Sequence, residues 1–125
     1  MDLIKIGELS QVTGVSIRML RYYEEQGLIR SERQSNGYRV FNPTVPEQVR
    51  TIKFYIELGL TTEQISGFLH CVMRNKESFC REIMPVYTQK LLEINEQIAM
   101  LTRIKSNLEE RMTAILEDDP NPKEK

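Results

Sequence analysis

The residues best suited to do chemistry in this sequence are arginines and tyrosines of a predicted helix over 17–26. Three apolar side chains can anchor this helix along one face: Ile17, Leu20 and Tyr23. The side chains left on its outer face are Arg18, Met19, Arg21 and Tyr22. Arginine can bridge guanine O6 and N7 or clamp a phosphate, and tyrosine presents a hydroxyl beside a flat apolar ring. The outer face therefore suits a DNA major groove, and the plain alternative is a solvated helix face with extended arginines.

Two short helices and a tight turn would position this face. Apolar residues recur at helical spacing over 6–13, and Gly14 is suited to end that helix in a left-handed conformation. Ser16 can cap the next helix, because its hydroxyl can accept from the exposed backbone N–H groups at the helix start. Two short helices joined by a glycine-containing turn are typical of a helix-turn-helix.

A β-hairpin, or wing, is predicted over 28–41. Apolar and polar residues alternate loosely there around Asn36-Gly37, a dipeptide that tolerates the positive φ angles of a type I′ turn. Tyr38 and Arg39 follow the turn directly, so the wing would carry an aromatic ring and a cation beside the second helix. In the alternative interpretation Tyr38 packs across the strand and Arg39 is simply exposed, and position alone does not separate the two.

A second pair of helices is predicted over 44–70. Thr44 with Glu47, and Thr61 with Gln64, have the spacing of a capping box. The first box opens an apolar-periodic segment whose members are Val49, Ile52, Phe54, Tyr55 and Leu58. The second opens a helix expected to bury Ile65, Phe68 and Leu69. We expect this pair to pack against the first pair.

The apolar pattern changes to a heptad seam in the last third of the chain. Its residues recur at intervals of four and three, interrupted only by Lys105, and are Tyr87, Leu91, Ile94, Ile98, Leu101, Leu108, Met112 and Ile115. No glycine or proline interrupts 86–119, and a helix of about 30 residues extends about 45 Å, longer than so small a core can cover. Since the chain has no second long heptad segment, the simplest partner for this helix is the same helix of a second copy, in a parallel or antiparallel two-stranded coiled coil.

The predicted fold is therefore mainly α, with three parts. A winged helix-turn-helix DNA-binding domain occupies 1–75, a connector and coiled-coil dimerisation helix 76–117, and a tail expected to be disordered 118–125. The mean hydropathy of -0.42 and the lack of any long apolar run in the 125 residues exclude a membrane span. The formal net charge of -1 gives no overall sign of a nucleic-acid partner. Within 16–39, however, five arginines stand against three glutamates, so any DNA surface must be local.

Four runs of residues occur together in one order and spacing: Ile6-Gly7-Glu8-Leu9, Thr13-Gly14-Val15-Ser16, Leu20-Arg21-Tyr22-Tyr23-Glu24-Glu25-Gln26-Gly27-Leu28-Ile29 and Gly37-Tyr38-Arg39. Jointly they resemble the MerR family of bacterial transcription regulators. The resemblance extends through Glu57-Leu58-Gly59-Leu60-Thr61 to the terminal helix, so it covers nearly the whole chain. As a joint pattern it is highly specific, unlike any one of its pieces.

The resemblance implies a winged helix-turn-helix on each protomer and an antiparallel coiled coil, so that two recognition helices enter successive major grooves of a palindrome. It also implies promoters with an overlong spacer, which the regulator bends and untwists until bound RNA polymerase engages both of its contact elements. By the same matching, Arg18 and Arg21 lie at the groove. Ser16 lies near a phosphate, and the residues at the DNA backbone are Tyr22, Tyr23, Tyr38 and Arg39.

Metal-sensing members resemble one another in a cysteine at the start of the dimer helix and a cysteine-containing loop after it. Cys80 fits the first place, but no Cys or His follows Met84, so we expect no metal site and no cofactor. His70, Cys71 and Cys80 could supply thiolate and imidazole ligands, and a redox-active thiol is another alternative, but packing cysteines are favoured. Any small-molecule effector is expected to use the dimer itself, around 70–85.

Two other functions fit parts of the sequence. An architectural DNA-binding protein would share the winged head, but the long seam disfavours it. A small enzyme or thiol-based detector would need a nucleophile, a base and an orienting group, and His70 beside Cys71 has no evident third partner. We therefore expect no catalysis. The two cysteines without a secretion signal indicate a reducing cytoplasm, and the expected partners are double-stranded promoter DNA, RNA polymerase and a second copy, without a membrane.

Overall fold

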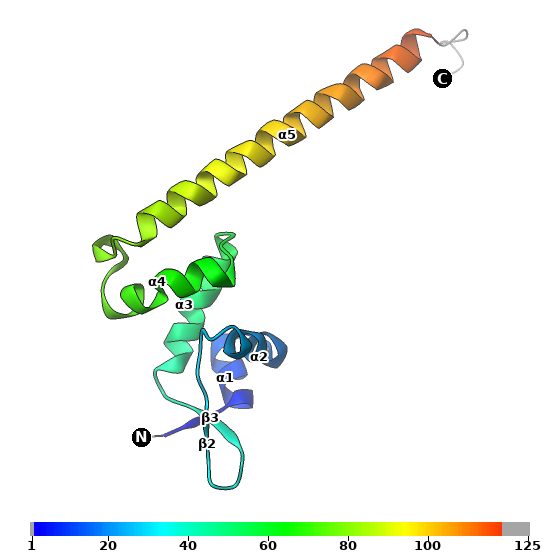
Figure 1. Ribbon diagram of the computed structural model, residues 1–125. Helices are drawn as coiled ribbons and strands as arrows, with labels where there is room; N and C mark the ends of the chain where they lie inside the picture. The colour runs from blue at the N-terminus through cyan, green and yellow to red at the C-terminus, as the bar shows by residue number, and fades with distance from the viewer. Residues whose placement is uncertain (1, 119–125) are drawn as a thin grey trace. The chain divides into compact units, whose positions relative to one another are not determined.

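The computed structural model describes residues 2–118, and the chain divides into two compact units after Val86 (Figure 1). The fold is mainly helical with one small sheet, as predicted. The tail predicted over 118–125 lies, apart from Asp118, outside the described residues. The elements in chain order are β1 (Ile4–Lys5), α1 (Ile6–Thr13), α2 (Ile17–Glu25), β2 (Glu32–Arg33), β3 (Arg39–Phe41), α3 (Val45–Glu57), α4 (Thr62–Arg74), a 3₁₀ turn η1 (Glu77–Phe79) and α5 (Ile83–Glu117).

The helix-turn-helix forms as its capping residues predict. Gly14 ends α1 with a φ of 72°, and its N–H donates to the carbonyl of Ser10. The hydroxyl of Ser16 accepts from the N–H of Met19 over 3.2 Å, which satisfies one of the free donors at the start of α2. The predicted anchoring role of Ile17 is wrong, because this first residue of α2 is 39% exposed. Leu20 and Tyr23 alone bury the inner face of α2.

The wing is part of a three-stranded antiparallel sheet with the order β1-β3-β2. Strand β1, only two residues long, was not predicted, because it is too short to show alternation. The predicted type I′ turn is wrong, because Gly37 has a φ of 86° while Asn36 does not have a positive φ. Instead, Gly37 N–H donates to Gln34 and Gln34 N–H donates to Tyr38, both over 2.9 Å, which is a three-residue turn with a glycine bulge.

One of the two predicted capping boxes exists. Thr61 accepts from the N–H of Gln64 over 3.1 Å, and the Gln64 side chain accepts from the N–H of Thr61 over 2.9 Å, so α4 starts as predicted. The box predicted at Thr44 is wrong. There the side chain of Asn42 accepts hydrogen bonds from both the N–H and the hydroxyl of Thr44, each over 3.0 Å. The hydroxyl of Thr44 therefore makes no capping hydrogen bond to the first N–H groups of α3.

The core joins the two helical pairs as expected. Helix α1 packs against α2 and α3, and α3 packs against α4. The rings of Tyr55 and Phe68 pack in a T-shaped arrangement with their centroids 4.8 Å apart, and the hydroxyl of Tyr55 donates to Glu77 over 2.7 Å. Ile65, Phe68 and Leu69 are buried as predicted, whereas two members of the preceding apolar segment, Phe54 and Leu58, are exposed.

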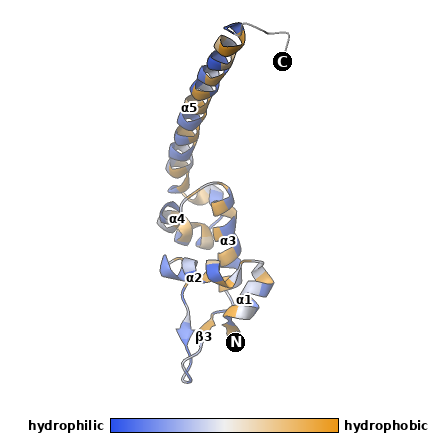
Figure 2. Cartoon of the chain, turned by 90° about the vertical axis from the view of Figure 1, so that its right-hand side faces the viewer, coloured by the Kyte–Doolittle hydropathy of each residue, from blue (hydrophilic) through white to orange (hydrophobic). Residues whose placement is uncertain are grey.

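Helix α5 contains 35 residues, somewhat more than the predicted length of about 30, because it begins at Ile83, before the stretch that is free of proline. Pro85 lies in its first turn, where a missing N–H costs no intrahelical hydrogen bond. Hydrophobic residues recur along the whole length of α5 in Figure 2. The predicted seam residues Tyr87 and Ile94 are half-buried, and the other six are exposed. No helix within residues 2–118 is both long and apolar enough to cross a membrane.

Candidate nucleic-acid interface

The outer face of α2 is exposed as its sequence predicts. Arg18, Met19, Arg21 and Tyr22 are all exposed, and Ser16 lies exposed just before them. The face combines two guanidinium groups with a phenol and a thioether, and its helix begins with N–H groups of which only some have partners within the helix. Arginine at these positions can reach base edges, while the helix start favours an anion such as phosphate.

Tyr23 does not belong to this face. It is 2% exposed and is one of the two residues that bury the inner side of α2, because it lies one helical turn from Leu20 on the side opposite the arginines. Burial, and then the negative charge of Glu57, raise the pKa of its hydroxyl. The role at the DNA backbone that the family resemblance implied for Tyr23 therefore conflicts with the burial of its ring.

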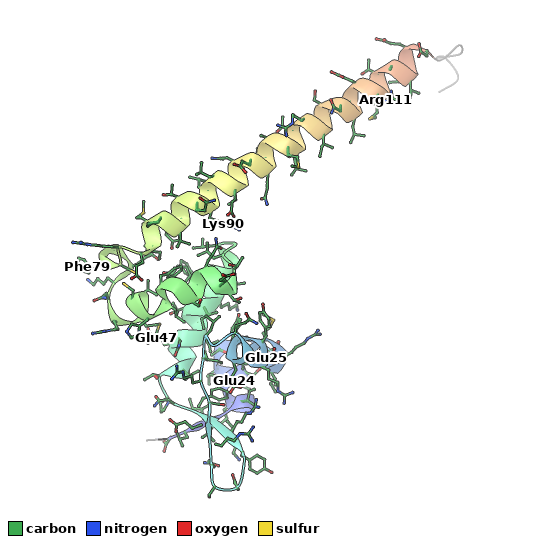
Figure 3. The ribbon with its side chains drawn as sticks, in the orientation of Figure 1. Glu24, Glu25, Glu47, Phe79, Lys90 and Arg111 are labelled. Carbon is green, nitrogen blue, oxygen red and sulfur yellow. The ribbon has the colours of Figure 1, made fainter. Side chains whose placement is uncertain are left out.

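The two wing residues differ in what they contact. Tyr38 is 65% exposed, with Lys5 Nζ 5.9 Å from its ring centroid, so it does not pack on the core. Arg39 is exposed and paired with the carboxylate of Glu24 from α2, at 3.2 Å (Figure 3 labels Glu24). The alternative in which Tyr38 packs on the core is therefore wrong, because its ring is exposed. Arg39 is exposed but not free, because its guanidinium is paired with Glu24.

An open hollow lies between β1, α2 and the wing, and we call it the basic hollow. The cations that line it are Lys5, Arg21, Arg33 and Arg39, and its other lining residues include Tyr38 and the single carboxylate of Glu8. Arg33 and Arg39 are direct neighbours across β2 and β3, an arrangement of like charges that an anion would relieve. The basic hollow therefore has the charge and the aromatic edge that suit a phosphate backbone.

Sequence reasoning missed two members of the basic hollow. Lys5 lies in β1, and the pairing of Lys5 with Val40 places it in the sheet beside the wing. Arg33 is brought opposite Arg39 by the register of β2 and β3, and its Nη1 donates to the carbonyl of Gly37 over 3.5 Å. Pairing the residues on either side of the turn at Gly37 would have placed Arg33 opposite Arg39. Nothing in the sequence indicates that Lys5 joins the same sheet.

A second group of functional side chains lies where α4 ends. The ligand atoms of Cys71, Cys80 and Glu82 all lie within 4.8 Å of one another. His70, which the sequence suggested as a partner of the two cysteines, instead has its Nε2 3.4 Å from Arg74. A hydrogen bond with Cys80, and then burial, raise the pKa of the Cys71 thiol.

The chain is similar to known regulators over most of its length. The model of the MerR family regulatory proteins matches residues 5–41. The HTH-type transcriptional regulator HmrR from Rhizobium leguminosarum bv. viciae is 33% identical over 106 residues, which cover 85% of this chain and 81% of that protein. A matched segment of that length necessarily includes the wing and both helices of the second pair, and it extends into α5.

Two solved structures share the fold. The lead(II) complex of a transcription regulator from Ralstonia metallidurans gives a TM-score of 0.74 at 19% identity, covering 86% of this chain and 83% of that one. HiNmlR, a MerR family regulator lacking the sensor domain and bound to promoter DNA, gives 0.54 at 20% identity, covering 93% and 92%. Sequence identity over most of both chains, together with the family model that spans the helix-turn-helix and wing, shows that this chain belongs to the MerR family of transcriptional regulators.

Proposed function

We propose that the chain recognises a promoter sequence as a homodimer and regulates transcription by distorting the DNA between the two half-sites. The residues proposed to contact DNA are Ser16, Arg18, Met19, Arg21, Tyr22, Tyr38 and Arg39, joined by Lys5 and Arg33 from the basic hollow. Arg18 and Arg21 would contact base edges in the major groove, and the basic hollow would hold the adjacent phosphate backbone.

The observation that carries this proposal is the continuity of the exposed α2 face with the basic hollow. Arg21 belongs to both, so one helix can present side chains to a groove while the wing contacts the flanking strand. An exposed amphipathic helix alone would not require a second cationic surface beside it. The promoter DNA bound by HiNmlR supports the same use of this fold.

The proposal of a homodimer depends on α5. Six of its predicted seam residues are exposed in the single chain: Leu91, Ile98, Leu101, Leu108, Met112 and Ile115. A monomeric soluble protein rarely exposes so long an apolar stripe, and heptad spacing fits the same stripe of an antiparallel second helix. Dimerisation would supply two α2 helices for the two halves of a palindrome.

We propose spacer distortion as the mechanism because two separate half-sites can be read together only if the intervening DNA adopts the matching twist and bend. RNA polymerase already bound at the promoter would then engage both of its contact elements. This work would take place in the cytoplasm, where the bacterial chromosome lies. A small-molecule effector would act by favouring one of the two DNA geometries.

The DNA contact is tested by gel-shift titration with the duplex upstream of the chain's own gene and an unrelated duplex of equal length. Arg21→Ala should lower specific affinity by about 1–3 kcal/mol, and combination with Arg18→Ala should abolish the specific complex. Arg103→Ala on α5 removes the same charge outside the proposed surface and should bind like the wild type. Unchanged binding by the double variant would refute the assignment of α2.

A further inference from the structure

Three side chains able to ligate a metal meet in the segment that connects α4 with α5. Cys71 lies in the last turn of α4, Cys80 follows η1, and Glu82 directly precedes α5. The two sulfurs and a carboxylate oxygen all lie within 4.8 Å of one another. In a tetrahedral zinc site with Zn–S bonds of about 2.3 Å, two sulfurs are about 3.8 Å apart, so only a small contraction separates this cluster from a ligand set.

The backbone around the cluster is held in place by hydrogen bonds. The N–H of Cys80 donates to the carbonyl of Glu77 over 3.0 Å, and the side chain of Asn75 donates to the carbonyl of Cys71 over 3.2 Å. The hydroxyl of Tyr55, in the core, donates to Glu77 over 2.7 Å and ties η1 to α3. Because η1 and the end of α4 are both fixed, the two sulfurs are brought together before any ligand arrives.

The chemistry of the three groups favours a cation among them. Two thiolates and a carboxylate whose ligand atoms lie within 4.8 Å of one another repel each other. A divalent cation bound between them would relieve this repulsion and gain a bond to each group. The geometry of the cluster therefore suits a bound ion.

We propose that each protomer binds one thiophilic divalent cation, of the Zn²⁺ or Cd²⁺ class, through the sulfurs of Cys71 and Cys80 and a carboxylate oxygen of Glu82. Two thiolates select such ions over Mg²⁺ or Ca²⁺, and a fourth position is left for water or another donor. Cys80 is 3% exposed while Glu82 is exposed, so the ion would enter from the side of Glu82. The site shares no residue with the proposed DNA surface, and its occupancy is measured without DNA.

The test is a titration of the full, reduced and metal-free protein with CdCl₂, followed by the ultraviolet charge-transfer band of cadmium thiolates. One equivalent per protomer is expected. Cys71→Ser and Cys80→Ala should each weaken binding at least about 100-fold, and Glu82→Gln should weaken it about 10-fold while the band persists. Glu63→Gln, which changes an exposed carboxylate of α4 outside the cluster, should bind like the wild type.

Because Cys80 is buried, each variant is first compared with the wild type by circular dichroism and thermal unfolding. Cobalt(II) gives a second reading, since tetrahedral coordination produces intense visible bands. The proposal is overturned if protein with two free thiols takes up no cadmium, or if uptake survives substitution of both cysteines. It is also overturned by one ion per two protomers, or by a Cys71–Cys80 disulfide in place of the ion in freshly purified protein.

Discussion

Arg39 of the wing strand β3 and Glu24 of helix α2 form an ion pair, with the guanidinium Nη1 3.2 Å from the carboxylate Oε1. The other oxygen of the same carboxylate accepts a hydrogen bond from the hydroxyl of Ser31, which precedes β2. Glu24 therefore joins both strands of the wing to α2. It also balances one of the two arginines that face each other across the hairpin.

We predict that Glu24→Gln lowers the specificity of DNA binding while it increases non-specific binding. The freed Arg39 can neutralise one more phosphate, so the slope of log K against log salt should steepen by about 0.9, while the loosened wing reads its site less well. The free energy of unfolding should fall by less than about 1 kcal/mol, because both partners are partly exposed. Gel shifts across a salt series measure both slopes, and Glu25→Gln on the same helix serves as control. A steeper specific slope with unchanged specificity would contradict the role of Glu24 in holding the wing.

We predict that Leu101→Glu weakens dimerisation about 100-fold or more, because each dimer loses two buried leucines that contribute about 1.5–3 kcal/mol apiece. Ser106→Glu introduces the same charge one position beyond Lys105, off the seam, and should leave the dimer intact. Sedimentation equilibrium over a range of protein concentrations compares the two variants. Equal dissociation constants would show that this seam is not the interface.

Two glycine substitutions are predicted to have opposite effects on stability. Gly37→Ala should lower the free energy of unfolding by about 1–2 kcal/mol, because the wing turn requires a φ of 86° there. Gly67→Ala, within α4, should raise it by about 0.5–1 kcal/mol. An added Cβ meets nothing within 4 Å at either position, so only the backbone conformation distinguishes them. Urea denaturation of both variants measures the two changes in the free energy of unfolding. A loss of stability in both variants would show that backbone conformation does not distinguish the two positions.

The buried hydroxyl of Tyr23 predicts a loss of stability in alkali. Its pKa is raised above the ordinary value of 10.0, first by burial and then by Glu57. Since the unfolded chain gives up this proton first, the contribution of Tyr23 is fully present below about pH 10 and is lost as the pH rises through the folded pKa. Urea denaturation between pH 8 and about 11 should therefore show a steeper decline for the wild type than for Tyr23→Phe. Parallel declines would mean that Tyr23 does not titrate differently in the folded state.

The helices and their capping residues were predictable because their signals are local. Gly14 and Ser16 fix the turn between α1 and α2 through bonds to residues three or four positions away, and Thr61 with Gln64 does the same for α4. The failure at Thr44 has the same origin. The hydroxyl of Thr44 donates to the side chain of Asn42, two residues earlier, and the capping-box pattern does not take that position into account.

The features that were missed depend on contacts between distant segments. Lys5 enters the basic hollow only because β1 pairs with β3, more than thirty residues away. Glu82 joins the two cysteines because η1 turns the chain back toward the end of α4. The sequence suggested His70, the direct neighbour of Cys71, only as one alternative ligand, and it lies beside Arg74 instead. The exposed residues of α2 followed from helical periodicity, but the pairing of Arg39 with Glu24 did not.

Strand β3 has a neighbour on each edge, and β1 on one of them runs without a break into α1. The hairpin cannot rotate independently, because a rotation of β3 would also have to move α1 and its buried residue Leu9. The wing and α1 are therefore expected to move together as one unit, so that adjustment of shape on DNA binding would fall largely on the double helix. The DNA sequences that the protein prefers would then depend in part on base-pair steps that bend at a low energetic cost, even at positions that no side chain contacts.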